Sequence, residues 1–101
     1  MLNDWLKELK YELLQGELEI PVKEVVYDSR KAGEETVFVC MKGMNVDSHD
    51  FIPAVLAAGT KALVVEHEVP GIPEDVTVLK VENGRNALAL LSAARFDYPA
   101  E

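Results

Sequence analysis

The chain of 101 residues is 49% hydrophobic and 28% charged, with a formal net charge of −8, which is ordinary for one globular domain. The acidic balance and the lack of a basic patch argue against nucleic-acid or anionic-membrane partners. No apolar run approaches the ~20 residues of a membrane span, and no secretory signal is evident at the N-terminus. The single cysteine, Cys40, is interpreted as a reduced core residue, so a cytoplasmic protein is predicted.

An amphipathic helix is predicted over about residues 3–15, because apolar side chains recur there at every third or fourth position. Asn3 is suited to cap the start of this helix, and Gly16 is suited to follow its end. Trp5 lies on the apolar stripe and is interpreted as a core residue rather than a ligand platform. The stripe comprises Leu2, Trp5, Leu6, Leu9 and Leu13.

Short strands and two further helices follow. Residues 18–20 are expected to be extended, and residues 36–41 form a nearly continuous apolar run that is typical of a central strand. The order of elements predicts a three-layer α/β domain with a small mixed sheet of four or five strands and about three helices. The predicted strands are 23–26, 36–41, 61–65 and 76–81, and the further helices are 51–58 and 84–96.

Capping residues mark the ends of the two later helices. Asp50 precedes the first of them, and Pro53 falls in its first turn, where a missing N–H costs nothing. Gly59 is expected to end that helix. Asn83 is expected to cap the last helix, and Pro99 to stop it.

Two polar loops follow neighbouring predicted strands. Tyr27–Arg30 comes after the first strand, and Gly43–Asp50 comes after the next. Because open α/β sheets hold ligands at the carboxyl ends of their strands, these loops form the candidate site. From the residues alone, Asp28 and Ser29 are more typical of a turn that bonds its own backbone. Arg30 is more typical of a pair with Asp28 than of a phosphate contact.

The second loop combines a flexible glycine with side chains that can bond a ligand or a helix start. Gly43 permits a backbone conformation that other residues resist, and Asn45 offers a donor and an acceptor for the edge of a planar base. Asp47 and Asp50 are both expected to bond free N–H groups of the following helix. They would then occupy its anion position, and a phosphate would meet the Tyr27–Arg30 turn instead.

His49 is the side chain that invites a metal or base hypothesis. No second histidine or cysteine lies at ligand spacing, and His67 is far along the chain, so a hydrogen-bonded structural histidine is expected. No Ser-His-Asp or Cys-His arrangement is evident. The sequence therefore predicts neither a catalytic nor a metal-binding residue in this chain.

The two loops, together and in this order, resemble the first domain of the Mur ligases, the ATP-dependent enzymes that build the peptide stem of peptidoglycan on a UDP-sugar. The Asp-Ser-Arg turn and the Asp-x-His-Asp-Phe-Ile helix entry are the more specific parts of this resemblance. It covers nearly all of the chain after residue 20. The matching segments are Val25–Lys31, Val37–Cys40, Lys42–Gly43, Asp47–Ile52, Gly59–Val65 and Arg85–Leu91.

In such ligases the first domain holds the uridine end of a UDP-muramoyl peptide. Carried over to this sequence, the resemblance implies substrate contacts at Tyr27 and Ser29 in the first loop and at Met44, Asn45 and Val46 in the second. Met44 and Val46 would supply apolar contact to the face of the base.

The chain departs from the family at two places. The family usually has Pro-Gly-Asp where this chain has Glu34, Glu35 and Thr36, which bears on the geometry of that turn. It usually has glycine where this chain has Ser48, which bears on the width of the pocket mouth. Neither departure removes a side chain that is expected to contact the ligand.

The resemblance also implies what this chain lacks. The second domain of these ligases opens with a phosphate loop for ATP, and no Gly-x-x-x-x-Gly-Lys-Ser/Thr segment occurs here. Residues 1–101 are therefore expected to be the N-terminal UDP-muramoyl-substrate-binding domain of a longer ligase, and to be non-catalytic alone. ATP, Mg²⁺ and the incoming amino acid would bind to the absent ATP-binding and C-terminal domains, which are the expected partners.

Within the family, the chain most resembles the ligases that add the third amino acid to UDP-N-acetylmuramoyl-L-alanyl-D-glutamate. Tyr27 and the Val-Cys end of the strand at Cys40 favour this choice. In the intact enzyme, ATP would phosphorylate the D-glutamate carboxylate, and the next amino acid would attack the acyl phosphate. The alternatives are the D-alanyl-D-alanine-adding ligase and, from another class, a non-catalytic binding or interaction module.

Overall fold

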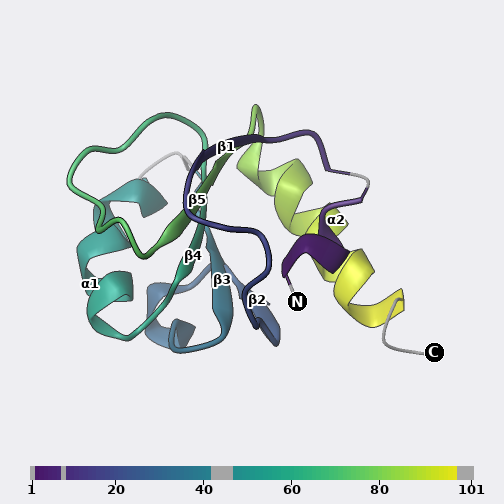
Figure 1. The fold of residues 1–101 in the computed structure, drawn as a ribbon, viewed down its shortest axis with the longest axis horizontal. Helices are drawn as coiled ribbons and strands as arrows, with labels where there is room; N and C mark the ends of the chain where they lie inside the picture. The colour runs from purple at the N-terminus through teal and green to yellow at the C-terminus, as the bar shows by residue number, and fades with distance from the viewer. Residues whose placement is uncertain (1, 8, 42–46, 98–101) are drawn as a thin grey trace.

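A five-stranded sheet lies between two helical layers (Figure 1) in the computed structural model, which describes residues 2–7, 9–41 and 47–97. The strand order is β1-β5-β4-β3-β2. The strands from β2 to β5 are parallel, and β1 pairs antiparallel with β5 at one edge. This arrangement confirms the predicted α/β domain with a mixed sheet. The strands are β1 (Glu12–Gln15), β2 (Glu24–Val26), β3 (Thr36–Val39), β4 (Ala62–Val65) and β5 (Thr77–Lys80).

Each face of the sheet is covered by one α-helix. Figure 1 shows α1 (Ile52–Ala57) on one side and α2 (Gly84–Asp97) on the other, with the first residues of the chain beside α2. None of the helices in the described ranges is long and apolar enough to cross a membrane. The remaining helical turns are of the 3-10 type: η1 (Leu2–Trp5), η2 (Ser29–Lys31) and η3 (Ser48–Phe51).

The helix predicted over residues 3–15 is wrong. The chain forms only the η1 turn there, and Glu12–Gln15 becomes strand β1 instead. The cause is tertiary, because β5 offers a free edge whose ladder bonds outweigh the helical preference of this segment. The apolar stripe still reaches the core, except that Leu13 now lies on the strand and is 42% exposed.

Gly16 does not end a helix, as was predicted, but ends β1. Its φ is +85°, and a Cβ there would lie 2.5 Å from Thr77 Cα, so the backbone passes β5 too closely for a side chain. The Thr77 hydroxyl accepts the Glu17 N–H at 3.1 Å and lies 2.6 Å from the Glu17 carbonyl oxygen, to which it donates. Residues 18–20, which were expected to be extended, form no strand, but Leu2 N–H donates to the Ile20 carbonyl at 2.9 Å.

The residues predicted to mark the ends of α1 and α2 are confirmed, and so is the buried central strand. Gly59 follows α1 with a φ of +103°, and Asn83 caps α2 by accepting the Asn86 N–H at 3.0 Å. Pro53 lies in the first turn of α1. All four residues of β3 are buried, as expected for a central strand. The predicted stop at Pro99 lies outside the described residues.

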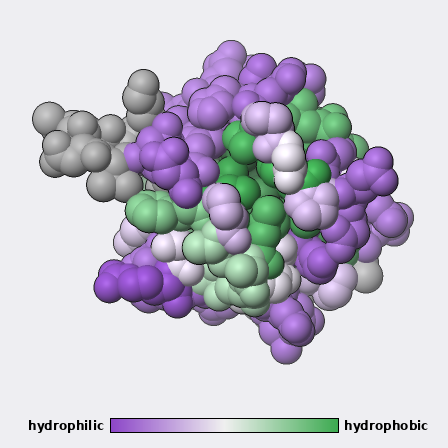
Figure 2. All heavy atoms as spheres, turned by 90° about the vertical axis from the view of Figure 1, so that its left-hand side faces the viewer, coloured by the Kyte–Doolittle hydropathy of each residue, from purple (hydrophilic) through white to green (hydrophobic). Residues whose placement is uncertain are grey.

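Two apolar cores lie on opposite faces of the sheet, because successive side chains of each strand point to opposite sides. The core beneath α2 contains Val37 and Val39 together with Trp5, which confirms the core interpretation of this tryptophan. The core beneath α1 contains Phe38 and Cys40. Figure 2 views the α1 side, where apolar side chains gather centrally within a hydrophilic rim. Partly buried members of this second core are Leu14, Ala32, Leu56, Val69 and Ile72.

Cys40 is buried and unpaired, as predicted. Burial raises the pKa of its thiol to about 12, and the carboxylates of Asp47 and Glu66 add to the shift. The thiol therefore stays protonated at neutral pH and behaves as a small apolar side chain.

Glu35 occupies the turn where the chain lacks the Pro-Gly-Asp segment. Its φ is +63°, and it is the one non-glycine residue with a positive φ in the described ranges. Its carbonyl accepts the Lys23 N–H at 2.6 Å, which holds the turn against the start of β2. Its carboxylate lies 3.3 Å from Lys23 Nζ in an exposed ion pair. The turn thus places a non-glycine residue in the left-handed region, at a cost of ~1–2 kcal/mol.

We expect Glu35→Gly to raise the free energy of unfolding by about 1 kcal/mol, since glycine removes the left-handed penalty but adds unfolded-state entropy. Urea denaturation followed by circular dichroism measures this change. Glu35→Ala is the matched control, because it removes the same ion pair and keeps the strain. Equal stability of the glycine and alanine variants would contradict the prediction.

Candidate functional site

The candidate site lies at the carboxyl edge of the parallel strands. The loop after β2 holds Tyr27–Lys31, and the described part of the loop after β3 holds Asp47–Phe51. Glu66 and His67 follow β4. The ends of parallel strands meet at one edge of a sheet, so these polar groups come together there.

The first loop is a turn closed by its own side chains. The Asp28 carboxylate accepts the Arg30 backbone N–H at 2.9 Å and caps η2. It also accepts the Arg30 guanidinium through Nε at 3.1 Å and through Nη2 at 2.8 Å. The predicted Asp28–Arg30 pair is therefore confirmed.

This pairing lowers the pKa of Asp28 to about 2, mainly through the side-chain hydrogen bond from Arg30 and then through the Arg30 backbone N–H. The same pair raises the pKa of Arg30. Both groups stay charged throughout the neutral range. The Arg30 side chain is nevertheless 87% exposed, so the outer side of its guanidinium faces solvent.

Two of the predicted substrate contacts lie on this turn. Tyr27 directly precedes it and is 60% exposed, which is unusual for a large aromatic side chain. Ser29 is its first helical residue and is half-buried. Within the described residues, no hydrogen bond occupies the Ser29 hydroxyl. Both side chains are accessible at the carboxyl edge of the sheet.

The other three predicted contacts, Met44, Asn45 and Val46, lie outside the described residues. The structure resumes at Asp47, whose carboxylate accepts the His49 N–H at 3.0 Å and caps η3 as predicted. This bond and the His49 side chain lower the pKa of Asp47.

The prediction that Asp50 caps the helix is wrong. Asp50 lies inside η3, exposed, and its own N–H donates to the Asp47 carbonyl at 3.0 Å. The N-cap position of α1 is Phe51, which makes no side-chain capping bond. Because η3 continues directly into α1, the Ile52 N–H already donates to the His49 carbonyl, and a second capping side chain has no role.

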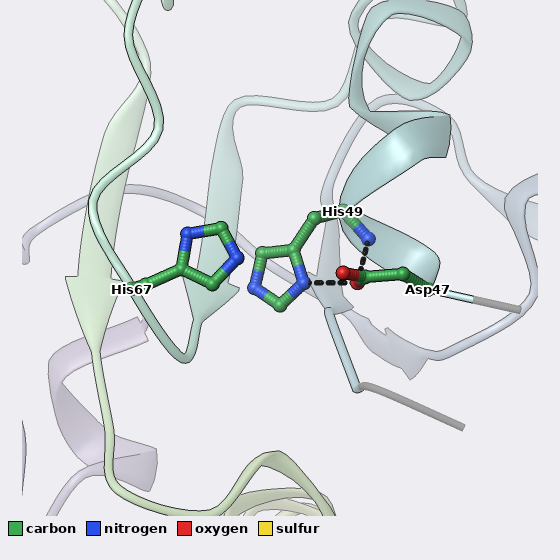
Figure 3. A group of neighbouring side chains, drawn as sticks. All are labelled: Asp47, His49 and His67. Atoms are coloured by element: carbon green, nitrogen blue, oxygen red, sulfur yellow. Dashed lines mark hydrogen bonds and ion pairs between the residues drawn. The ribbon is translucent and has the colours of Figure 1, made fainter. Parts of the chain in front are cut away.

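His49 is almost fully buried and is bonded through both ring nitrogens, and Figure 3 shows the bond of Nδ1 to Asp47. Nδ1 lies 2.5 Å from Asp47 Oδ1, and Nε2 accepts the Glu66 backbone N–H at 3.0 Å. The expectation of a hydrogen-bonded structural histidine is confirmed. Because the backbone N–H can only donate, Nε2 must hold a lone pair, which places the proton on Nδ1.

His67 is close to His49 in space, although it is 18 positions away in the sequence. The two rings are stacked, with centroids 4.1 Å apart and planes inclined by 21°. One ligand-type atom from each of Asp47, His49 and His67 lies within 4.8 Å of the others (Figure 3). The spacing of these residues along the chain did not predict that they lie together, because their proximity depends on β3 and β4 being adjacent in the sheet.

The geometry of the three side chains favours hydrogen bonding over metal ligation. Imidazole lone pairs lie in the ring plane, so two nearly parallel stacked rings direct theirs along separate planes. Both nitrogens of His49 are also already engaged. A tetrahedral ion would require the rings to turn and the Glu66 N–H to lose its acceptor.

Glu66 links this cluster to the last helix. Its carboxylate accepts the Gly84 N–H at 2.6 Å, at the first residue of α2. A Cβ on Gly84 would lie far inside van der Waals contact of the Cys40 carbonyl oxygen and 2.9 Å from Met41 Cγ. The start of α2 therefore rests directly on the loop that follows β3.

Residues 21–96 match the sequence profile described as Mur ligase family, catalytic domain. The chain belongs to the Mur ligase family. It is 40% identical, over 100% of its length, to a UDP-N-acetylmuramoyl-L-alanyl-D-glutamate–2,6-diaminopimelate ligase of Clostridium perfringens, of which it covers 21%. It is 35% identical, over 98 residues, to the corresponding L-lysine ligase of Staphylococcus haemolyticus, covering 97% of this chain and 20% of that protein.

The fold agrees with a solved Mur ligase structure. With a TM-score of 0.81 and 25% identity, 99% of the chain superposes on 22% of the UDP-N-acetylmuramoylalanyl-D-glutamyl-2,6-diaminopimelate–D-alanyl-D-alanyl ligase from Acinetobacter baumannii. The chain thus spans about a fifth of the length of each relative.

Three features of this Mur ligase chain were missed by sequence reasoning. These are the His67 stack, the Glu66 bonds and the tight contact at Gly84. The start signal of α2 is local, since Asn83 precedes it, but the Glu66 carboxylate reaches Gly84 from another strand. A sequence pattern that spans one element cannot show such a pair.

In this Mur ligase domain, Gly84→Ala is expected to lower the free energy of unfolding by about 2 kcal/mol, because the new methyl group would push α2 away from the Cys40 carbonyl. Thermal and urea denaturation measure the loss. Gly33→Ala is the matched control, since a Cβ there meets nothing within 4 Å. If Gly84→Ala were as stable as the control, α2 could shift away from Cys40 without loss of folding free energy, and the prediction would be wrong.

The ionisation of Asp28 gives a second prediction. Its folded pKa lies below the unfolded value, so its contribution to stability is present above about pH 4 and is lost as the pH falls toward about 2. We expect carboxyl ¹³C NMR to give a pKa of about 2, and Arg30→Gln to raise it toward the ordinary 3.8. Lys31→Gln is the control and should shift it far less; equal shifts in both variants would refute the specific pairing.

Proposed function

We propose that this chain binds the uridine end of a UDP-N-acetylmuramoyl peptide as the N-terminal domain of a Mur ligase of peptidoglycan synthesis. The observation that carries the proposal is the placement of an exposed Tyr27 and an accessible Ser29 on a rigid turn, at the carboxyl edge of the sheet. Asp47 caps η3, which continues into α1, and α1 contacts the η2 part of this turn.

The proposed contacts divide by chemistry. Tyr27 offers an aromatic face to the base or ribose, and the Ser29 hydroxyl offers a donor and an acceptor. Asn45 is proposed to bond the edge of the base, with Met44 and Val46 giving apolar contact, although these three residues lie outside the described ranges. The Asp28–Arg30 pair holds the turn that presents Tyr27 and Ser29.

The phosphates of the ligand must approach groups that the protein has not already used. The N–H donors at the start of η3 and α2 are taken by Asp47 and Glu66. Helix starts are good anion sites only while their N–H groups are free. We therefore propose that the phosphates approach Ser29 and the exposed side of Arg30.

The rest of the reaction is proposed to lie in a longer protein. The sequence contains no phosphate-loop segment, so ATP and Mg²⁺ are assigned to the other domains of the ligase. The part of this domain is positioning. By holding the uridine, it would place the far carboxylate of the substrate where those domains can act on it.

Two members of the family remain as candidates for the full ligase. The names of the relatives from Clostridium perfringens and Staphylococcus haemolyticus favour addition of the third amino acid, as diaminopimelate or lysine. The solved Acinetobacter baumannii structure favours addition of D-alanyl-D-alanine. An assay of the full ligase with each UDP-muramoyl peptide and each amine separates them, because only the correct pair yields phosphate release.

The uridine site is tested by NMR titration of the ¹⁵N-labelled chain with UMP, and with AMP as the control nucleotide. We expect UMP to shift the amides of Tyr27–Arg30, and AMP to shift them much less. Ser29→Ala should weaken UMP binding by about tenfold, which corresponds to one lost hydrogen bond.

Ser92→Ala is the matched variant, because Ser92 is a half-buried serine on α2, away from the loops, and should leave UMP binding unchanged. Identical shifts with UMP and AMP, or no shifts at millimolar UMP, would count against the proposed site.

A further inference from the structure

Two hydrogen bonds of the His49 ring connect the segments that follow β3 and β4 at the carboxyl edge of the sheet, and Figure 3 shows the one with Asp47. Its Nδ1 is bonded to Asp47, which caps η3, and its Nε2 is bonded to the Glu66 N–H beyond β4. The Glu66 carboxylate continues the connection to the first N–H of α2, at Gly84. We call Asp47, His49, Glu66 and Gly84 the strand-end relay.

The end of β4 explains why an acceptor is needed at this point. Cys40 N–H donates to the Val64 carbonyl and Val81 N–H donates to the Val65 carbonyl, each at 2.8 Å, so the ladders on both sides of β4 close there. The Glu66 N–H is the first donor beyond them. A partly buried N–H without an acceptor is costly, and the side chain from η3 provides one.

One protonation state of His49 satisfies both bonds. Nε2 faces a donor and must carry a lone pair, whereas Nδ1 faces a carboxylate and must carry the proton. The ring is therefore neutral with its proton on Nδ1. An imidazolium would direct a second N–H at the Glu66 N–H. The ionisable side chains in contact with the ring are Asp47, bonded to Nδ1, and His67, stacked on the ring.

We propose that His49 is a positioning residue for the uridine ligand. It acts by fixing Asp47 relative to the carboxyl end of β4 and the first residue of α2. Asp47 caps η3, which continues into α1, and α1 contacts the η2 turn that carries Ser29, so the position of Asp47 bears on that turn. His49 is 7% exposed and acts through Asp47 rather than by touching the ligand. This role rests on the proposed uridine-binding function and adds His49 and Glu66 to the residues that support the site.

Three variants separate the parts of the strand-end relay. His49→Asn keeps a side-chain donor near Asp47 but is too short to reach the Glu66 N–H. His49→Gln has a carbonyl that reaches the Glu66 N–H in place of Nε2. His67→Ala removes the stacked ring and leaves every bond of the relay intact.

The first readout needs no ligand. Long-range ¹H–¹⁵N spectra of the wild-type chain should show a protonated Nδ1 and a lone-pair Nε2 on His49. Amide exchange at Glu66 should accelerate by about tenfold or more in His49→Asn, and should stay close to wild type in His49→Gln and His67→Ala. A fourth variant, His49→Met, is close to glutamine in volume but has no strong acceptor, so exchange at Glu66 should be as fast as in His49→Asn, whereas a purely local cavity effect would leave it close to wild type.

The second readout is the affinity for UMP, measured under conditions in which each variant is folded by its NMR spectrum. We expect His49→Asn to weaken UMP binding by about tenfold, and His49→Gln and His67→Ala to stay within about threefold of wild type. His49→Met should weaken UMP binding as much as His49→Asn, so that the order of the variants follows the Glu66 bond rather than the volume of the side chain.

Two results would overturn the positioning role. One is a His49 proton on Nε2, and the other is unchanged UMP affinity in His49→Asn despite faster exchange at Glu66. A wild-type chain that fails to bind UMP overturns the proposed function separately. In that case the tautomer and the exchange pattern still decide whether His49 ties the loop to the sheet.

Discussion

The arrangement at the carboxyl edge depends on the contact between the Gly84 backbone and the Cys40 carbonyl. Without a Cβ at Gly84, α2 begins directly against the residue that follows β3. This closeness places the Gly84 N–H within 2.6 Å of the Glu66 carboxylate. Glu66 in turn presents its backbone N–H to His49. A larger residue at this one position would separate the helix from the hydrogen bonds that organise the loops.

At the same edge of the sheet, carboxylates of this acidic domain are hydrogen-bonded to its own backbone. Asp28, Asp47 and Glu66 each accept one or more backbone N–H groups, and the pKa values of Asp28 and Asp47 are lowered by these bonds. The carboxylates therefore serve as internal ligands of turns and helix starts. For a ligand that carries phosphates, we expect the base and ribose contacts to contribute more to affinity than charge attraction, since the net charge is −8.

A strained turn lies at the opposite end of the strands. Glu35 adopts a left-handed backbone, with a φ of +63°, directly before β3. The chain retains this geometry because the Glu35 carbonyl receives the Lys23 N–H and so closes the connection to β2. A conformational preference is overridden here by a backbone hydrogen bond, at a position far from the proposed ligand.

Local patterns alone determined much of this protein. Continuous apolar runs gave β3 and β4, Gly59 and Asn83 marked helix ends, and adjacent opposite charges predicted the Asp28–Arg30 pair. Each of these features is decided within a few residues, so sequence spacing is enough to find it. Asp50 fails as a cap for a local reason, because η3 begins after Asp47 and continues directly into α1. Tertiary structure alone decided that residues 12–15 form a strand and that His67 stacks on His49. Those outcomes depend on which strands are neighbours in the sheet. A few hydrogen bonds to a free strand edge, or to a donor from a distant segment, can outweigh the helical preference of a short segment.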